Sequence, residues 1–289
     1  AYDGILGWAQ TRVADVTGDA RPDIVYLDDA YPTNGYRVMV NQGTSFAPPQ
    51  NWGAYDPIHS WSAWWVADMN GDGKGDLFYL DDSYDATGYR AMLSTGAGFA
   101  APVGWGDYDS VVGWAQTWVV DANGDRKADL LYLDNAYGST GFRVQASTGT
   151  GFASPATWGT YDPIHDWATF RVSDVTGDGL PDLVYLDDAY PTNGYRVKRN
   201  LAQPAGYASS GASGRSLLLT ITPFGRDASV DSAGAITGGT SLPPSRFATP
   251  PATNGFAPEA NWAAYDGIHA WSAFFTADAT GDGKDDLIY

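Results

Sequence analysis

An acidic nonapeptide of the form Asp-x-[Thr/Asn]-Gly-Asp-x-x-x-Asp occurs five times in this chain of 289 residues. The copies begin at positions 15, 68, 121, 174 and 278, so the first four follow one another at intervals of 53 residues and the last follows after 104. A fixed period of this length is typical of repeat architectures, in which each unit packs against its neighbours. The repeat therefore constrains the fold more than any other feature of the chain.

One period contains four short segments typical of β-strands. In the second copy, Trp61–Ala67 precedes the nonapeptide, Leu77–Leu80 follows it, Tyr89–Leu93 comes after a polar turn, and Gly98–Trp105 is a weaker fourth. Short runs separated by turns, with no helical periodicity, indicate a four-stranded antiparallel unit. Several such units close radially into a β-propeller. We therefore predict an all-β fold, a β-propeller of four-stranded antiparallel blades of 53 residues each.

The register of the repeat is interrupted once. We divide the chain into propeller blades at residues 1–197, an Ala/Ser/Gly/Pro-rich segment at 198–253, and a resumed, truncated blade at 254–289. The middle segment is about one blade long, which favours a degenerate blade, but its composition favours an insertion, and both interpretations stay open. The chain starts and stops within a repeat, so we expect an incomplete ring from a longer polypeptide.

The nonapeptide has the chemistry of a calcium loop. Positions 1, 3, 5 and 9 offer side-chain oxygens and position 7 a backbone carbonyl, which suits Ca²⁺ better than Mg²⁺. Turn-forming residues alone do not explain three aspartates at fixed offsets in five copies, since such carboxylates repel one another without a cation. The EF-hand is excluded, because it needs a Glu at position 12 and flanking helices. We expect up to five Ca²⁺ sites, weaker where Ala20 and Arg126 replace glycine, with these ligands: Asp15, Thr17, Asp19, Arg21 and Asp23; Asp68, Asn70, Asp72, Lys74 and Asp76; Asp121, Asn123, Asp125, Lys127 and Asp129; Asp174, Thr176, Asp178, Leu180 and Asp182; Asp278, Thr280, Asp282, Lys284 and Asp286.

The charge of the chain limits its partners. A formal charge of −18 disfavours nucleic acid and anionic membranes, and five bound Ca²⁺ ions would reduce it to −8. Without cysteine the chain has neither disulfides nor thiolate metal sites. No apolar run is long enough to span a membrane, so we expect no membrane insertion by this segment. Weak calcium loops fill only where Ca²⁺ is abundant, which favours a secreted, extracellular bacterial protein.

The loop, set between two short strands at this period, resembles the FG-GAP or VCBS repeat of integrin α-chain propellers. The resemblance rests on sequences such as Asp-Met-Asn-Gly-Asp-Gly-Lys-Gly-Asp at 68–76, and it covers nearly the whole chain outside 198–253. It implies that the loop joins the first two strands of each blade and binds Ca²⁺.

A second, narrower resemblance involves the interruption. The segments Gly-Arg-Ser-Leu-Leu-Leu-Thr-Ile at 214–221 and Leu-Pro-Pro-Ser-Arg-Phe at 242–247 resemble the SpvB-like B subunits of insecticidal toxin complexes and their Rhs-type relatives. In that family a propeller docks onto another protein subunit and gates the exit of an enclosed toxic domain. The chain shows no YD-repeat shell of the kind found in those proteins.

All three histidines occupy one position of a repeated Tyr-Asp-[Pro/Gly]-Ile-His-x-Trp motif, as His59, His165 and His269. The equivalent positions in the other copies carry Leu6 and Val112. A catalytic histidine is normally single and paired with a unique nucleophile. We therefore favour a packing role for these histidines over ligand contact, and ligand contact over catalysis.

A further motif, Tyr-Leu-Asp-[Asp/Asn]-x-Tyr-x-x-x-Gly-[Tyr/Phe]-Arg, ends at Arg37, Arg90, Arg143 and Arg196. Its paired acidic residues suggest the two carboxylates of a glycosidase, but catalysis needs two unlike environments, and this pair is copied in every complete unit. A cross-strand ion pair between Asp and Arg is the simpler interpretation. The turn tyrosines offer an alternative contact surface for sugar or protein: Tyr31, Tyr84, Tyr137 and Tyr190.

Tryptophan recurs near the end of each unit, as Trp52, Trp105, Trp158 and Trp262. We expect these side chains to fill the gap between adjacent blades, with carbohydrate stacking as the alternative.

These observations favour a calcium-stabilised, non-catalytic interaction module over an enzyme, and we assign no catalytic residue and no organic cofactor. The preferred setting is an exported SpvB/Rhs-type toxin subunit that docks on another protein subunit. The alternatives are a lectin that binds a surface glycan and an accessory domain of a secreted hydrolase.

Overall fold

The structure is a computed structural model of the chain. It describes residues 11–28, 35–54, 64–81, 88–107, 117–134, 141–160, 170–187, 194–202, 220–221, 229–230, 236–238, 245–246, 255–258, 260–264 and 275–288. Within these ranges all regular secondary structure is β-strand, and no helix occurs. The predicted all-β fold is confirmed.

Four antiparallel sheets of four strands each make up most of the described structure. The first contains β1 (Thr11–Ala14), β2 (Asp23–Asp28), β3 (Gly35–Met39) and β4 (Gln50–Ala54). The second contains β5 (Trp64–Ala67), β6 (Asp76–Asp81), β7 (Gly88–Met92) and β8 (Val103–Asp107). The third contains β9 (Thr117–Val120), β10 (Asp129–Asp134), β11 (Gly141–Gln145) and β12 (Ala156–Thr160). The fourth contains β13 (Arg171–Ser173), β14 (Asp182–Asp187), β15 (Gly194–Lys198) and β20 (Ala260–Ala264).

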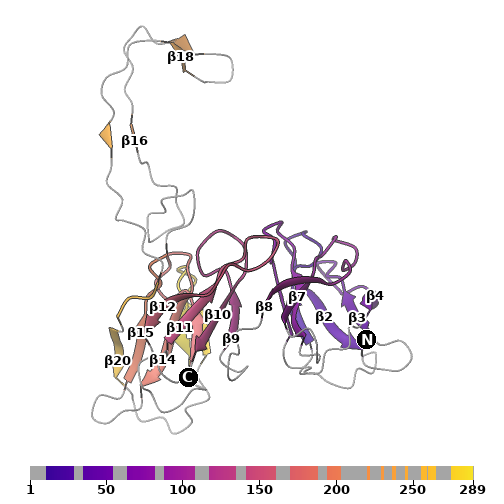
Figure 1. The fold of residues 1–289 in the computed structure, drawn as a ribbon, viewed down its shortest axis with the longest axis horizontal. Helices are drawn as coiled ribbons and strands as arrows, with labels where there is room; N and C mark the ends of the chain where they lie inside the picture. The colour runs from indigo at the N-terminus through magenta and orange to yellow at the C-terminus, as the bar shows by residue number, and fades with distance from the viewer. Residues whose placement is uncertain are drawn as a thin grey trace.

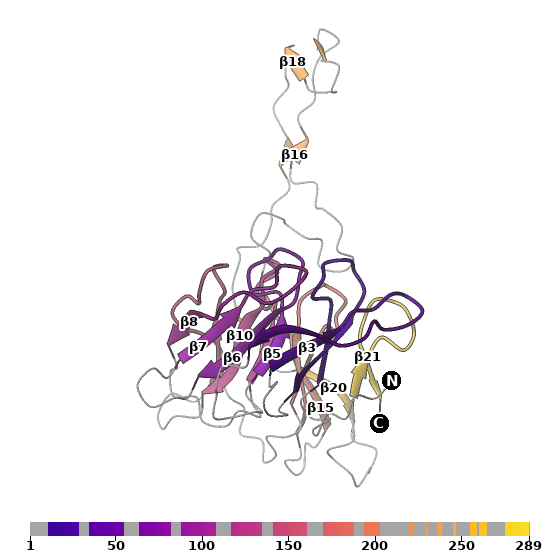
Figure 2. The same ribbon diagram turned by 90° about the vertical axis from the view of Figure 1, so that its right-hand side faces the viewer.

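Three two-stranded pairs complete the described strands. β21 (Phe275–Ala277) pairs with β22 (Asp286–Ile288) and follows the fourth sheet. β16 (Thr220–Ile221) pairs with β19 (Ser245–Arg246), and β17 (Ser229–Val230) pairs with β18 (Ile236–Gly238). The pairs that contain β16 and β18 lie apart from the four-stranded sheets (Figures 1 and 2).

The sheets stand side by side in an open arc (Figures 1 and 2). Their first strands are neighbours: β1 contacts β5, β5 contacts β9, and β13 contacts β21. This is the radial arrangement of propeller blades, and it does not close into a ring. The predicted incomplete propeller of four-stranded antiparallel blades is therefore confirmed.

The fourth strand of each blade begins later than predicted. In the second sheet we expected it over Gly98–Trp105, whereas β8 starts at Val103. Phe99 instead forms an isolated bridge with Ser94, and the N–H of Thr95 donates to the carbonyl of Gly98 (2.9 Å), so this part of the chain is a tight turn. Alternation of apolar and polar residues could not distinguish this turn from a strand.

The core lies between adjacent sheets. Trp52 of β4 packs edge-on against Phe99 of the next unit, with 5.5 Å between ring centroids, and Trp158 packs on Phe256 in the same way at 5.8 Å. Trp52, Trp105 and Trp158 are at most 6% exposed, so their predicted role as inter-blade wedges is confirmed. The fourth tryptophan, Trp262, is 49% exposed, because the described part of the next sheet consists of β21 and β22 only.

The fourth sheet is built from both sides of the interruption. β15 pairs with β20, whose residues lie more than 60 positions later in the chain. The turn that connects these strands begins as in the other sheets: Asn200 bridges Phe256, and the N–H of Leu201 donates to the carbonyl of Gly255 (2.9 Å). The chain thus leaves the fourth sheet at this turn and returns to it. The division at 197/198 and 253/254 stays a prediction.

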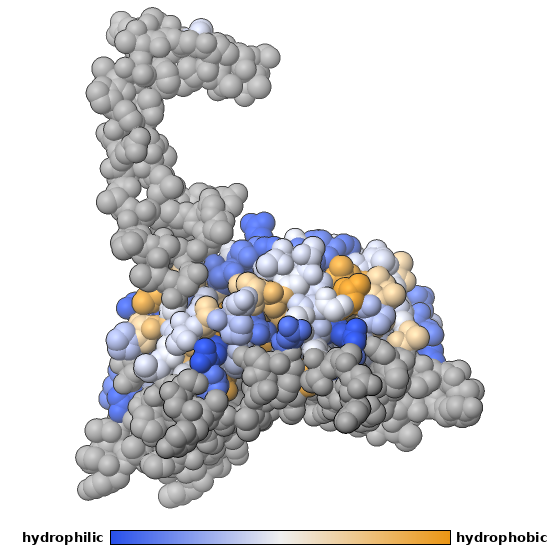
Figure 3. Space-filling model, viewed as in Figure 1, coloured by the Kyte–Doolittle hydropathy of each residue, from blue (hydrophilic) through white to orange (hydrophobic). Residues whose placement is uncertain are grey.

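The face of the arc seen in Figure 3 is mainly hydrophilic or pale, with small separate apolar patches. In the described part of the chain there is no helix with the length and apolar character needed to cross a membrane.

Candidate functional site

Each acidic loop connects the first and second strands of its sheet. In the second sheet it runs from Asp68, directly after β5, to Asp76, which opens β6. Oδ1 of Asp68 accepts hydrogen bonds from the backbone N–H groups of Gly71 (2.7 Å) and Asp72 (3.1 Å), and Oδ2 accepts one from Gly73 (2.8 Å). The same three bonds recur in the other four loops. The first aspartate therefore closes the loop by pairing three N–H groups that point inward.

The last aspartate of the loop is buried and ties the loop to the third strand. Asp76 is fully buried, and its Oδ2 accepts a hydrogen bond from the N–H of Met69 (3.0 Å). Its Oδ1 accepts one from the N–H of Ser94, just after β7 (2.7 Å). Similar bonds are made by Asp23, Asp129 and Asp182. These carboxylates hold two segments of their sheet together, whatever else they bind.

Burial shifts the pKa values of three of these carboxylates strongly. Burial raises the pKa of Asp76 and of Asp129 to about 7 and that of Asp182 to about 6. Bonds from backbone N–H groups oppose the rise, while the other carboxylates of the same loop add to it. The loop therefore disfavours three negative charges at once, and a bound cation would relieve this repulsion.

In three loops a cation at the seventh position pairs with the aspartate at the fifth, and the first of these pairs joins Arg21 and Asp19 at 3.5 Å. Nζ of Lys74 lies 2.7 Å from Oδ2 of Asp72, and Nζ of Lys127 lies 2.8 Å from Oδ2 of Asp125. The fourth loop has the apolar Leu180 at the equivalent position, buried in the adjoining core. The carboxylates of loops one, two and three are thus partly neutralised from within.

The predicted ligands of each loop are brought together in one tight turn, and their chemistry suits a hard cation. Their oxygens, however, face backbone N–H groups and lysine ammonium groups. No three acidic or histidine side chains of the described residues are arranged to hold a metal ion. A carboxylate oxygen has two lone pairs, so a bond to N–H leaves each oxygen capable of ligation. The donor set fits Ca²⁺, and the calcium sites stay a prediction.

Sequence reasoning missed a set of hydrogen bonds between sheets. Between the first and second sheets, which we call the first junction, the N–H of Gly75 donates to the carbonyl of Asp15 (2.7 Å). Oγ of Ser94 donates there to the carbonyl of Val16 (2.6 Å). The N–H of Phe99 also donates to the carbonyl of Trp52 (2.7 Å). The second of these bonds recurs at later junctions, from Ser147 to Met69 and from Asn200 to Ala122, at 2.7 Å each. Its sequence signal is a small polar residue at intervals of 53: Asn41, Ser94, Ser147 and Asn200.

The first aspartate of the Tyr-Leu-Asp-[Asp/Asn] motif pairs with an arginine on the neighbouring strand. Nε of Arg37 lies 2.8 Å from Oδ2 of Asp28. The corresponding distance is 2.5 Å for both Arg90 with Asp81 and Arg143 with Asp134. The cross-strand ion pair is therefore confirmed in three sheets, and these carboxylates are engaged structurally.

Two sets of residues singled out in the sequence lie outside the described residues. They are the histidines His59, His165 and His269 and the turn tyrosines Tyr31, Tyr84, Tyr137 and Tyr190.

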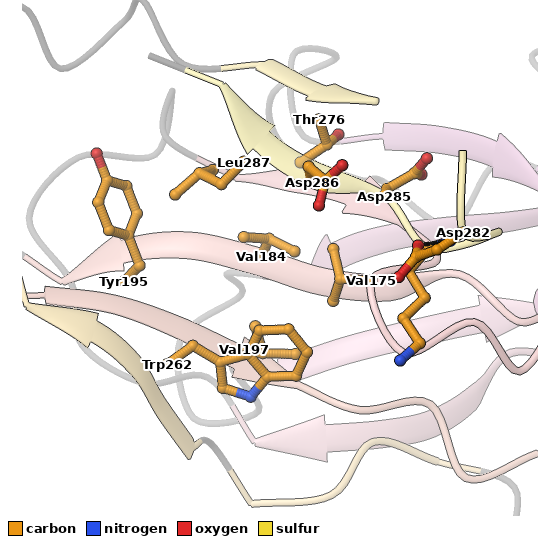
Figure 4. Close-up of a pocket in the computed structure, with 11 residues that line it drawn as sticks. Val175, Val184, Tyr195, Val197, Trp262, Thr276, Asp282, Asp285, Asp286 and Leu287 are labelled. Atoms are coloured by element: carbon orange, nitrogen blue, oxygen red, sulfur yellow. Dashed lines mark hydrogen bonds between the residues drawn. The ribbon is translucent and has the colours of Figure 1, made fainter. Parts of the chain in front are cut away.

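One pocket of about 350 Å³ lies between the fourth sheet and the β21–β22 pair. Figure 4 shows Trp262 on one side of it, Leu287 and Asp286 on the other, and Val184 between them. The same space at the first junction is filled by the side chains of Met92 and Phe99. The pocket is therefore an incomplete junction between blades, and its polar lining comes from the last acidic loop and the strands beside it, as Thr276, Asp282, Lys284, Asp285 and Asp286.

Part of the chain, from the first acidic loop into the second sheet, matches the model of a known family. Residues 15–79 match the model of the FG-GAP-like repeat. The FG-GAP resemblance drawn from the nonapeptide is confirmed for that stretch, which includes the first two acidic loops. The third and fourth sheets repeat the same strands and the same loop hydrogen bonds.

Among solved structures, this chain is similar to the Photorhabdus luminescens Tc holotoxin pore with a mutated TccC3 component, at 16% identity and a TM-score of 0.39. It is also similar to TcdB2–TccC3 without the hypervariable C-terminal region, at 14% identity and a TM-score of 0.39. The matches cover 98% and 80% of this chain, but only 13% and 11% of those chains. No curated protein matches this chain by sequence.

Proposed function

We propose that this chain is a calcium-stabilised, non-catalytic propeller module that acts by contacting another protein subunit. The observation that carries the proposal is the exact repetition of its polar sites: the first aspartate makes the same three backbone bonds in all five loops. An active site needs groups held in unlike environments, whereas sites copied from blade to blade serve the scaffold.

A bound Ca²⁺ ion would neutralise the loop carboxylates in place of the basic side chain that pairs with them. The ion would bind the oxygens of the first, third, fifth and ninth residues and the carbonyl of the seventh. In the second loop it would displace the ammonium group of Lys74 from Asp72, which leaves that side chain free to move into solvent. Because the first and last aspartates already tie the loop to its strands, the added binding energy stabilises the whole sheet.

Chelation tests this role directly. Excess EDTA should lower the midpoint of thermal unfolding by about 5 °C or more, since ligand at 100 times its dissociation constant adds about 2.7 kcal/mol per site. Calorimetric titration of the chelated protein should then detect several Ca²⁺ ions per chain, and Mg²⁺ should restore less stability.

The matched control is Asp178→Asn, in the fourth loop, where the apolar Leu180 takes the place of the cation. It should remove one Ca²⁺ ion from the titration and keep the remaining sites. An unfolding midpoint that EDTA leaves unchanged would contradict the stabilising role of calcium.

The proposed setting is an exported toxin-complex subunit of the SpvB/Rhs type. The two segments that carry this resemblance meet in space: β16 and β19 pair antiparallel, with Thr220 opposite Arg246 and Ile221 opposite Ser245. The described residues of the two segments thus lie together, apart from the four-stranded sheets, and would offer a surface for contact with a second subunit. Coexpression of the chain with candidate translocation subunits, followed by copurification with and without residues 203–254, tests this docking.

The lectin alternative gains no support from the described residues. Of its two possible stacking surfaces, the tryptophans Trp52, Trp105 and Trp158 are buried between sheets. The turn tyrosines, which are the other surface, lie outside the described residues. No observation on the described residues favours sugar over protein contact, so we develop the protein-contact proposal.

A further inference from the structure

The seventh residue of the acidic loop changes from basic to apolar along the chain. It is Arg21, Lys74, Lys127, Leu180 and Lys284 in the five copies. Only the backbone carbonyl of this residue is offered to Ca²⁺, so ligation does not restrict its side chain. The side chain can therefore influence the loop in another way.

In the second and third loops this side chain competes for the oxygen that a cation would use. Nζ of Lys74 lies 2.7 Å from Oδ2 of Asp72, and Nζ of Lys127 lies 2.8 Å from Oδ2 of Asp125. Both lysine side chains are only 25% exposed. Arg21 of the first loop lies farther from its aspartate, at 3.5 Å, and is 53% exposed. Each basic side chain thus stands in for a bound cation, and the lysines do so most closely.

The stem of each lysine is held between two glycines. A Cβ atom on Gly18 of the preceding loop would lie 3.0 Å from Cγ of Lys74. A Cβ atom on Gly96, between the third and fourth strands of the lysine's own sheet, would lie 3.7 Å from Cδ. Lys127 makes the corresponding contacts in the third sheet. Because packing already orders the long side chain, the entropy that usually weakens a surface ion pair is largely lost beforehand.

The fourth loop has an apolar side chain in this place. Leu180 is 4% exposed and belongs to the same core cluster as Ala122 of the preceding loop. Among the described residues no basic side chain forms an ion pair with Asp178, on which Arg199 acts only at longer range. The carboxylates of this loop are therefore neutralised least by the protein itself.

We propose that the seventh side chain sets the order in which the loops take up Ca²⁺. The fourth loop fills at the lowest concentration, and the second and third loops fill last. This order rests on the Ca²⁺ binding proposed for the loops. In the second and third loops the ion must first break the pair between lysine and aspartate, so its dissociation constant should be higher by roughly fivefold, the upper range for a surface ion pair.

The loop that fills first also lies beneath the long interruption. The N–H of Asn200, where the chain leaves the fourth sheet, donates to Oδ1 of Asp182 (2.8 Å). The side-chain amide of Asn200 donates to the carbonyl of Ala122 in the third loop (2.7 Å). A Ca²⁺ ion bound by Asp182 would therefore fix the start of the interruption before the second and third loops are filled.

Three backbone N–H groups report on these loops one at a time. Those of Ser94, Ser147 and Asn200 donate to the last aspartate of loops two, three and four, at 2.7, 2.7 and 2.8 Å. A Ca²⁺ titration of the chelated, isotope-labelled protein, followed by nuclear magnetic resonance, resolves their signals. The Asn200 signal should reach its midpoint at a Ca²⁺ concentration roughly fivefold below those of Ser94 and Ser147.

Lys74→Met tests the charge, because it keeps most of the stem and the backbone carbonyl. It should lower the midpoint of the Ser94 signal to near that of Asn200 and leave Ser147 unchanged, so the third loop is the matched reference. Lys74→Arg keeps the charge and should leave the Ser94 midpoint high. Leu180→Lys should raise the Asn200 midpoint by roughly fivefold. Thermal melts check the fold of each variant, and Lys74→Met remains decisive if a lysine in the core position of Leu180 unfolds the protein.

The outcomes separate this order from calcium binding itself. Equal midpoints of the three signals in the wild-type chain, or a Ser94 midpoint that Lys74→Met leaves in place, would overturn the order alone. A titration in which none of the signals responds to Ca²⁺ would overturn both the order and the stabilising role of calcium.

Discussion

The sixth residue of each acidic loop has a left-handed backbone conformation whichever side chain it carries. Gly73, Gly179 and Gly283 have φ values of 84°, 85° and 83°. Ala20 and Arg126 occupy the same position with φ values of 64° and 70°. A residue with a Cβ atom is strained there by about 1 kcal/mol or more. The hydrogen bonds to the first aspartate therefore decide the loop conformation against the local preference of these two residues.

Replacing Arg126 or Ala20 by glycine should stabilise the protein. Relief of strain outweighs the greater freedom of glycine in the unfolded chain, so we expect a gain of about 0.5–1 kcal/mol for each substitution. Denaturant unfolding measures it. The matched control is Gly73→Ala, which should cost a similar amount, because the space around that Cβ position is open and only the backbone is strained. A less stable Arg126→Gly variant would show that the arginine side chain matters more than the backbone.

At the scale of the element, burial and backbone hydrogen bonds act in opposite directions on the pKa values of the loop aspartates. Desolvation acts to raise the pKa of Asp15, but hydrogen bonds from the backbone outweigh it and the pKa is lowered. For Asp76 and Asp129 burial prevails, and the pKa rises to about 7. The position in the loop does not decide the direction alone, since burial also raises the pKa of Asp121, the first aspartate of the third loop.

These pKa values predict how the stability of the metal-free protein depends on pH. Above the unfolded-state pKa near 3.8, the folded state retains protons on Asp76 and Asp129 that the unfolded state has lost. Stability should therefore fall as the pH rises to about 7, by at most about 1.4 kcal/mol per pH unit for each carboxyl group. Asp15 is ionised in both states above pH 5 and does not contribute to the slope.

Thermal melts in EDTA between pH 5 and pH 8 measure this dependence. With excess Ca²⁺ the trend should reverse, because the ion binds the deprotonated carboxylates. Asp129→Asn removes one titrating group and should flatten the metal-free slope. A metal-free midpoint that rises with pH across this range would contradict the assignment.

At the scale of the whole molecule, the long interruption starts from a turn that is short in the other sheets. In the first sheet Asn41 and Phe46 bridge, and the N–H of Gln42 donates to the carbonyl of Ser45 (2.8 Å). In the fourth sheet the same bridge and bond close the turn at Asn200 and Phe256, although 55 residues lie between them. The strands on either side are therefore placed by the sheet and not by the segment that connects them.

Replacing residues 201–255 by the four residues Gln-Gly-Thr-Ser of the first sheet should leave the propeller folded. We expect the thermal midpoint to change by no more than about 3 °C, because loop closure depends weakly on loop length. The same variant also separates the role of the propeller sheets from that of the interruption. Docking on a second subunit should be lost, while Ca²⁺ binding is kept. An unfolded product would show that the interruption contributes to the core of the fourth sheet.

The repeat made most of the fold predictable. An interval of 53 residues and four short apolar runs identified the four-stranded sheets, the loop between the first two strands, and the tryptophan wedges. The sequence also predicted the Asp–Arg pairs, because an acid before a turn and a base after it meet across adjacent strands. For the loops it predicted the donor set, since ligand type follows directly from residue type.

Only the tertiary structure decided which partners these side chains have. That Asp76 accepts bonds from the N–H groups of Met69 and Ser94, and that Ser94 reaches the preceding sheet, depends on segments distant in sequence. The place of β20 in the fourth sheet also depends on such contacts, because local pattern cannot tell which strand edge a returning segment will join. Periodicity along the chain specifies the units, but burial and pairing between units arise only when the sheets pack.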